Sequence, residues 1–145
     1  MHPFYREFEL DKPVSDFFKM QGYTVLKEVK IGFCRADIVA FKDDFVVAVE
    51  LKLSDRKKAI VQAKNYLLGA DFVYLAFPLQ KIHNVLLKCE QLLVDEGIGL
   101  LSVNEKTCRV SSIIAAKPSK RKFASVTLHE VCKRREGKRS KYKIY

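Results

Sequence analysis

Apolar residues near the N-terminus recur at the spacing of a helix that buries one face. They precede Gly22, which offers a C-terminal stop, and they are Phe4, Phe8, Val14, Phe17 and Phe18. Proline inside a helix removes a hydrogen bond and crowds the preceding turn, so Pro13 predicts either a kink or a main helix that starts near Lys12. The chain therefore opens with a helical segment.

Three β-rich runs come next, each bounded by turn residues. They cover residues 24–31, 34–41 and 45–53. Gly32 separates the first two runs, and a short polar gap at residues 42–44 separates the second from the third. Such a gap between apolar runs is typical of a β-hairpin, so the second and third strands are expected to pair.

The rest of the chain alternates between helical and strand patterns. Ser54 or Asp55 can cap a helix that ends before Gly69, and Pro78 closes an apolar strand. The expected elements are a helix over 56–68, a strand over 71–77, a helix over 81–97, and strands over 98–103 and 109–115. The whole order, α-β-β-β-α-β-α-β-β, predicts a mixed α/β layer structure.

Two charged residues interrupt the apolar strand that begins at Phe45. Strand alternation places Glu50 and Lys52 on one face, about 6.6 Å apart along the strand. Ionised side chains cost several kcal/mol to remove from water unless they find partners or bind a metal. A strand built only for stability would carry Val or Ile at both positions.

The expected hairpin register brings a second carboxylate to this pair. A turn made of residues 43–44 places Asp37 opposite Glu50, with both side chains on the same face. Any loop of even length keeps that parity, whereas an odd loop would turn Asp37 to the other face. The most natural register therefore gathers Asp37, Glu50 and Lys52.

These three residue types together suit metal-assisted hydrolysis of a phosphodiester. Two adjacent carboxylates repel and raise a pKa unless a cation lies between them. Mg²⁺ or Mn²⁺ suits such an oxygen-rich pair, because Mg²⁺ binds through one or two carboxylates, water and substrate phosphates. A neighbouring lysine can position the attacking water and stabilise charge that develops on a phosphate. The alternative, a solvated ion-pair cluster on a surface hairpin, is disfavoured by the apolar neighbours of all three residues.

Asp37, followed by Glu50-Leu51-Lys52, resembles the signature of the PD-(D/E)xK nuclease superfamily. The resemblance covers roughly residues 4–77 and is to small prokaryotic members. It implies a restriction-endonuclease-like core, α-β-β-β-α-β, with a mixed central sheet flanked by helices and with C-terminal helix and strand additions. Ala36 stands where the motif has proline, at a position that varies in the superfamily.

The resemblance also implies further site residues. In such nucleases an acid on the first helix often completes the metal site, and Glu7 is preferred here over Glu9, with Glu28 as a third candidate. Some members carry glutamine and tyrosine four residues apart on the helix after the lysine strand, a spacing that Gln62 and Tyr66 share. Gln62 would then contact the metal's water or a phosphate.

On the same helix face, Lys58 joins the residues expected to contact nucleic acid. By the resemblance, Tyr66 would line the nucleic-acid groove. Further candidate contacts lie near the C-terminus, and they are Lys133, Arg134, Arg135, Lys138 and Arg139.

The net charge of +10 is concentrated near the C-terminus. Residues 1–116 hold 16 Lys/Arg and 15 Asp/Glu, whereas residues 117–145 hold 11 Lys/Arg and 2 Asp/Glu. We expect a nuclease-like α/β domain over 1–116 and a basic extension over 117–145 that packs on this domain or projects from it. Such a segment is either a solubilising tail or the footprint expected for binding a phosphate backbone.

Length and composition fit one soluble domain. The 145 residues are 48% hydrophobic and 30% charged, no apolar stretch approaches a membrane span, and the N-terminus lacks a signal-peptide layout, so a cytoplasmic protein is expected. The four cysteines lie far apart and are interpreted as structural thiols. No GxSxG elbow, P-loop or GxGxxG turn occurs, which disfavours serine hydrolysis and P-loop nucleotide binding.

The leading hypothesis is a Mg²⁺- or Mn²⁺-dependent nuclease, an endonuclease or an exonuclease, with DNA as the favoured substrate. Asp37 and Glu50 would hold the metal with Glu7 or Glu9, and Lys52 would orient the attacking water. A homodimer is expected, because small nucleases that cut both strands usually pair by two-fold symmetry. Two alternatives remain: a catalytically inactive nucleic-acid-binding module of the same fold, and a protein-interaction subunit whose basic tail binds an acidic partner. Substrate form and sequence specificity do not follow from the sequence.

Overall fold

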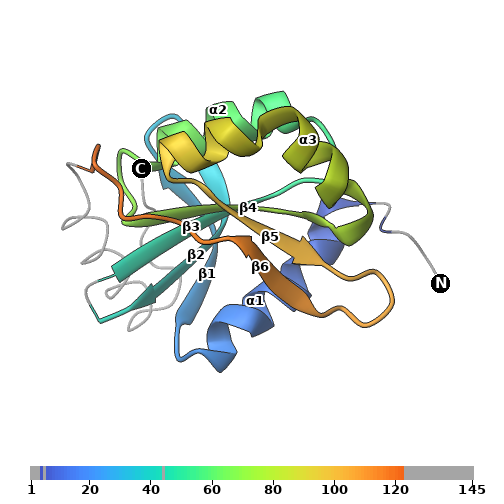
Figure 1. The fold of residues 1–145 in the computed structure, drawn as a ribbon. Coiled ribbons are helices and arrows are strands. Elements are labelled where there is room, and N and C mark those ends of the chain that lie inside the picture. Colours follow the sequence, from blue (N-terminus) through green and yellow to red (C-terminus); the bar gives the residue numbers. More distant parts are fainter. Residues whose placement is uncertain (1–3, 5, 44, 123–145) are drawn as a thin grey trace.

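One six-stranded sheet forms the centre of the molecule (Figure 1). The computed structural model describes residues 4, 6–43 and 45–122. The strands lie side by side in chain order, and they are β1 (Thr24–Ile31), β2 (Cys34–Lys42), β3 (Phe45–Leu51), β4 (Phe72–Pro78), β5 (Gly99–Val103) and β6 (Val110–Ile114). The sheet is mixed, because β3, β4 and β5 run parallel while the other neighbouring pairs are antiparallel.

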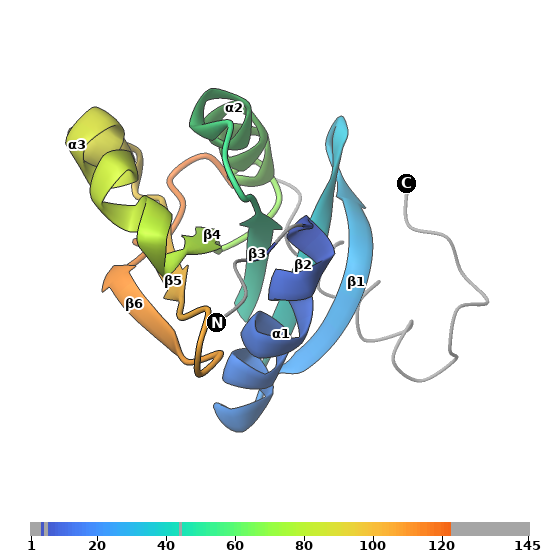
Figure 2. The same ribbon diagram turned by 90° about the vertical axis from the view of Figure 1, so that its right-hand side faces the viewer.

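Helices cover both faces of this sheet (Figure 2). They are the short 3-10 helix η1 (Glu7–Leu10) and the α-helices α1 (Asp11–Met20), α2 (Arg56–Tyr66) and α3 (Leu79–Glu96). On one face, Leu10 and Val14 pack against a buried cluster that includes Val49 of β3. On the other face, α2 and α3 cover a second cluster, so the sheet is buried between two apolar layers.

The predicted order of elements is confirmed, with small changes at element ends. The first helix is split as Pro13 indicated, since η1 precedes α1 and the proline lies in the first turn of α1, where its missing N–H costs no helical bond. Asp55 caps α2 by accepting a hydrogen bond from the Lys58 N–H at 3.2 Å. Strand β3 ends at Leu51, so Lys52 follows the strand directly instead of lying inside it.

The register of the β2–β3 hairpin agrees with the sequence prediction. Lys42 faces Phe45, and Ile38 faces Val49. One step further along the same register, Asp37 comes level with Glu50. The apolar hairpin therefore carries both carboxylates to the same end of the sheet.

The first residues of the basic extension pack on the domain. The Lys117 N–H donates to Gly97 O at 3.0 Å, and the Ser119 hydroxyl donates to Leu67 O at 2.6 Å. Lys122 forms an ion pair with Asp71. The predicted contacts at Lys133, Arg134, Arg135, Lys138 and Arg139 lie outside the described residues. In the described part of the chain, no helix is long and apolar enough to cross a membrane.

Candidate active site

Glu50 and Lys52 are both buried at the carboxyl end of β3. Their exposed fractions are 3% and 7%, and Lys52 Nζ lies 3.6 Å from Glu50 Oε2. The Lys52 N–H donates to Ala76 O at 3.0 Å, which extends the pairing with β4 by one residue and fixes the backbone of Lys52. The charged pair that the sequence placed in an apolar strand is thus held inside the protein.

Asp37 reaches the same point from β2. The Leu51 N–H donates to Asp37 Oδ2 at 2.8 Å, so the aspartate lies across the last residue of β3. Its carboxyl group lies close enough to that of Glu50 for each to shift the pKa of the other. The structure therefore brings together the three residues of the predicted motif.

Burial of the two carboxyl groups favours their protonated forms. Loss of solvent raises the pKa of Glu50 to about 7, and the neighbouring Asp37 charge adds to this rise, whereas the Tyr66 hydroxyl and Lys52 oppose it. Burial also raises the pKa of Asp37 above its usual value, although the hydrogen bond from the Leu51 N–H works against this. A divalent cation would relieve the same repulsion and keep both groups ionised.

An irregularity in the β1–β2 hairpin lies opposite Asp37. Lys27 pairs with Ile38 and Val29 pairs with Ala36, but no pairing joins Glu28 to Asp37 between them. Glu28 has a positive φ of 50°, a left-handed conformation that is uncommon for a residue other than glycine.

This distortion changes which strand residues face α2. Leu26 and Val29 both pack into the cluster under α2 and α3, although an undisturbed strand would point them to opposite faces. Val39 and Ala36 of β2 show the same change. The local break in alternation thus falls where Asp37 turns toward the end of β3.

The three candidate acids, Glu7, Glu9 and Glu28, have different surroundings in the structure. Glu7, on η1, is close enough to Asp37 for its charge to contribute to the raised pKa of that carboxyl group. Glu9 Oε1 instead accepts a hydrogen bond from the Arg6 N–H at 2.9 Å. Glu28 is exposed on β1. Which of these acids completes a metal site stays a prediction, and Glu7 is the one whose charge acts on Asp37.

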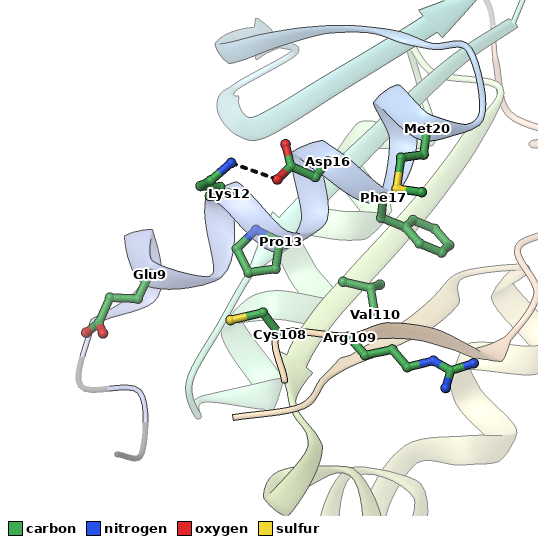
Figure 3. Close-up of a pocket in the computed structure, with 9 residues that line it drawn as sticks. All are labelled: Glu9, Lys12, Pro13, Asp16, Phe17, Met20, Cys108, Arg109 and Val110. Carbon is green, nitrogen blue, oxygen red and sulfur yellow. Dashed lines mark hydrogen bonds and ion pairs between the residues drawn. The ribbon is translucent and has the colours of Figure 1, made fainter. Parts of the chain in front are cut away.

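Glu9 lines a different feature, an open groove of about 490 Å³ between α1 and the start of β6 (Figure 3). The groove also contains the ion pair of Lys12 with Asp16, at 2.8 Å, and Arg109 from the turn before β6. Its lining is mainly apolar, with Phe17 as its largest side chain. None of the motif residues Asp37, Glu50 and Lys52 lines this groove.

Tyr66 of α2 occupies a position that differs from the predicted one. Its side chain is fully buried, so it cannot line a nucleic-acid groove as the resemblance implied. Its hydroxyl lies 2.7 Å from Glu50 Oε1 and 2.7 Å from Arg35 O. Because α2 packs on the sheet, the Tyr66 hydroxyl bonds the Glu50 carboxylate and holds it in position. Burial and the Glu50 charge raise the pKa of Tyr66, which keeps the phenol neutral.

Gln62 and Lys58 lie one and two turns before Tyr66 on α2. Gln62 Oε1 is buried and has no hydrogen-bond partner among the residues that the structure describes. A buried amide oxygen without a partner is costly, and a bound water, cation or ligand donor would satisfy it. Lys58 is exposed in the first turn of the helix.

The first turn of α2 concentrates positive charge beside Lys52. Arg56, Lys57 and Lys58 follow one another there and outnumber the one carboxylate of the capping residue Asp55. The N-terminal end of a helix also carries a partial positive charge from its unpaired N–H groups. This end of the molecule therefore suits an anionic ligand.

The donor set fits a divalent cation with few protein ligands. Within the described part of the chain, no group of three His, Cys, Asp or Glu side chains is arranged to hold a metal ion. Mg²⁺, however, usually retains several waters and binds through one or two carboxylates. Asp37 and Glu50 supply two adjacent carboxylates, and the unpartnered Gln62 oxygen lies on α2 one turn before Tyr66, whose hydroxyl bonds Glu50.

Comparisons with known proteins show a shared fold and no family. No protein-family model and no curated protein matches the chain. It is similar to the solved structure of SPO1766, a protein of unknown function from Silicibacter pomeroyi, with a TM-score of 0.60, 15% identity and 97% of each chain covered. For Pyrococcus furiosus SfsA in complex with Ca²⁺, the TM-score is 0.38 and the identity 14%, over 77% of this chain and 61% of SfsA. The likeness to SPO1766 establishes that this mixed α/β arrangement occurs in a second protein.

Proposed function

We propose that this protein is a metal-dependent nuclease of the PD-(D/E)xK type, with a restriction-endonuclease-like core. The observation that carries the proposal is the burial of Glu50 and Lys52 beside Asp37 at the end of an apolar strand. Folding gains little from this arrangement, because a buried ion pair is often no more stabilising than apolar residues of similar size. Paired carboxylates next to a lysine are, by contrast, what phosphodiester hydrolysis needs.

Each residue of the site has a role that follows from its position. Asp37 and Glu50 would hold Mg²⁺ or Mn²⁺, with Glu7 of η1, whose charge acts on Asp37, as a further ligand. When bound, the divalent ion would neutralise phosphate charge and make water more acidic. Lys52, held 3.6 Å from Glu50, would orient the attacking water and stabilise the negative charge that develops on the phosphate.

The remaining residues support binding and orientation. Gln62 offers an unpartnered amide oxygen to the water or to a ligand donor. Tyr66 fixes Glu50 by its hydroxyl, and the basic first turn of α2 attracts the phosphate backbone. Water then attacks phosphorus, the bond to the 3′ oxygen breaks, and a 5′-phosphate and a 3′-hydroxyl result.

A cleavage assay on the purified chain tests this proposal. Linear, supercoiled, single-stranded and four-way-junction DNA, together with single-stranded RNA, would be incubated with Mg²⁺, Mn²⁺ or EDTA. We expect metal-dependent cutting that falls at least about 100-fold in Glu50→Gln and in Lys52→Ala, because both groups act on the reacting phosphate.

Lys106→Ala is the matched control for the lysine variant. Lys106 is exposed in the turn between β5 and β6, so its loss should leave cutting unchanged. Binding of nucleic acid without cutting of any substrate would reject the nuclease and favour a non-catalytic binding module. Equal activity in the wild-type protein and both site variants would show that the cutting comes from elsewhere.

A further inference from the structure

The tip of the β1–β2 hairpin presents an aromatic ring to solvent. Phe33 is 93% exposed, the largest exposed fraction among the large apolar residues that the structure describes. A single exposed apolar side chain is common on protein surfaces and needs no explanation by itself. What distinguishes this ring is how firmly its backbone is held.

Asn65 of α2 fixes the hairpin tip with both ends of its side-chain amide. The Phe33 N–H donates to Asn65 Oδ1 at 3.2 Å, and Asn65 Nδ2 donates to Ile31 O at 2.6 Å. Gly32, between them, has a positive φ of 62°, and a Cβ there would lie 2.5 Å from Asn65 Oδ1. The Phe33 ring thus projects from a turn whose backbone is hydrogen-bonded to α2.

The same helix positions Glu50 of the candidate site. Tyr66, the residue after Asn65, bonds Glu50 and also the backbone of Arg35, two residues after Phe33. Adjacent residues of α2 therefore fix the aromatic tip and the carboxylate relative to one another. Along β2, Phe33 precedes Asp37 by four residues, which corresponds to about 13 Å of extended chain.

Exposed cationic side chains on the tip and on α2 favour a polyanion as the partner. Arg35 is exposed near the tip, and Lys57 and Lys58 are exposed at the other end of α2 from Asn65, whereas Lys64, next to Asn65, forms an ion pair with Glu96 at 3.7 Å. A protein surface that combines cationic side chains with a rigid exposed ring has the chemistry of single-strand nucleic-acid recognition, in which the charges follow the backbone and the ring stacks on a base.

We propose that Phe33 stacks on an unpaired nucleobase and holds it next to the carboxylate site. The ligand class rests on the proposed function, which supplies nucleic acid as the substrate. A ring can stack only on a base whose face is free, so the hairpin selects single-stranded, frayed or branched substrates over continuous duplex. Phe33 is therefore a specificity residue rather than a catalytic one.

Tryptophan fluorescence tests the contact without relying on cleavage. The chain contains no tryptophan, so Phe33→Trp introduces a single emitter at the hairpin tip. Met20→Trp is the matched control, because Met20 is 88% exposed at the end of α1. That end lies beside Lys42, whose Nζ donates to Gln21 O at 3.0 Å, at the opposite end of β2. Both proteins would be titrated with an oligothymidylate of about 12 nucleotides and with a blunt duplex, in EDTA and in Ca²⁺.

We expect the oligothymidylate to quench the fluorescence of Phe33→Trp more strongly than the duplex does, and to leave that of Met20→Trp nearly unchanged. Phe33→Ala should weaken oligothymidylate binding about tenfold or more, while Phe33→Trp should retain the affinity of the wild-type protein. Because both side chains are exposed, none of these substitutions should alter folding, and circular dichroism would verify that.

The possible results separate this inference from the nuclease proposal. Unquenched fluorescence of Phe33→Trp and unchanged affinity of Phe33→Ala would overturn the stacking contact, even if the cleavage assay succeeds. Quenching in Phe33→Trp and weakened binding by Phe33→Ala, with no cutting of any DNA or RNA substrate, would support the contact and reject the nuclease. If Phe33→Ala instead changes the sedimentation of the protein alone, the ring contacts another protein chain and the inference is wrong.

Discussion

At the residue scale, the site depends on two charges that the fold alone does not require. Burial of Glu50 and Lys52 carries a desolvation cost, which their mutual attraction and the Tyr66 hydroxyl offset only in part. The pKa of Glu50 is raised to about 7 because these contacts do not fully replace the water that its carboxylate loses. A proton or a bound cation at Glu50 would lower this cost.

The proton at Glu50 should make metal-free stability depend on pH. The folded pKa of about 7 lies above the ordinary value of 4.5, so the folded state binds the proton more tightly than the unfolded state does. This contribution is full below about pH 4.5 and is lost as the pH rises through about 7. Asp37, whose pKa is also raised, acts in the same direction.

Urea unfolding in EDTA at pH 5 and pH 8 would measure this effect. We expect the wild-type protein to lose on the order of 2 kcal/mol of unfolding free energy over that range through Glu50, and Glu50→Gln to lose much less. The same loss in both proteins would show that Glu50 does not titrate in this window. Saturating Mg²⁺ should reduce the pH dependence of the wild-type protein, because a bound cation replaces the proton.

At the element scale, the β1–β2 hairpin turns Asp37 toward the end of β3. The pairing is interrupted at Glu28, and the strand residues on either side face the same apolar cluster. Because Glu28 has a positive φ, its backbone conformation is set by the hairpin and not by its own side chain. The resemblance offered Glu28 as a third candidate metal ligand, and its side chain is exposed at the irregularity.

Two substitutions at Glu28 should therefore differ in their effect on stability. Glu28→Gly removes the cost of the left-handed conformation and should leave stability unchanged or raise it by a few tenths of a kcal/mol. Glu28→Val places a β-branched side chain at the same φ and should cost about 1–2 kcal/mol. Thermal unfolding would measure both. Cutting that persists in Glu28→Gly would also remove Glu28 from the metal site, whereas its loss would restore that assignment.

At the scale of the whole molecule, the basic extension begins far from the site. Asp71, which pairs with Lys122, accepts a hydrogen bond from the Val46 N–H at 2.8 Å, near the start of β3. Glu50 lies four residues further along this strand, about 13 Å away by the strand rise. The extension therefore starts at one end of β3, while the carboxylates and the basic turn of α2 lie at the other.

Charge removal from the extension should weaken binding rather than chemistry. The change consists of glutamine at five positions, which are Lys133, Arg134, Arg135, Lys138 and Arg139. We expect lower affinity for nucleic acid and a log-affinity slope against log salt that is smaller by about 3.5 to 4.5, because each phosphate contact contributes about 0.7 to 0.9. The rate of cutting at saturating enzyme should stay unchanged. Unaltered affinity and slope would mean that the extension binds something other than this substrate.

Much of the fold could be predicted from local patterns. Alternation located β2 and β3, the polar gap at residues 42–44 fixed their register, and the register aligned Asp37 with Glu50. Each inference depends on neighbours within about ten residues, where backbone geometry alone decides which side chains share a face. The order of the helices and strands followed for the same reason.

Contacts between segments far apart in the chain could not be predicted from the sequence patterns. Helical spacing placed Gln62 and Tyr66 on one face, but it did not reveal how deeply that face sinks into the sheet, and Tyr66 proved to be buried against Glu50. The tie of Asn65 to the hairpin tip joins residues more than 30 positions apart, and no local signal marks it.

The sequence by itself thus determined the elements, the hairpin register and the identity of the charged trio. Tertiary structure alone decided that Tyr66 supports Glu50 and that the extension starts at the opposite end of β3. The physical reason is that periodicity records which residues leave water, whereas the partner that each buried group meets is set by how helices pack on the sheet.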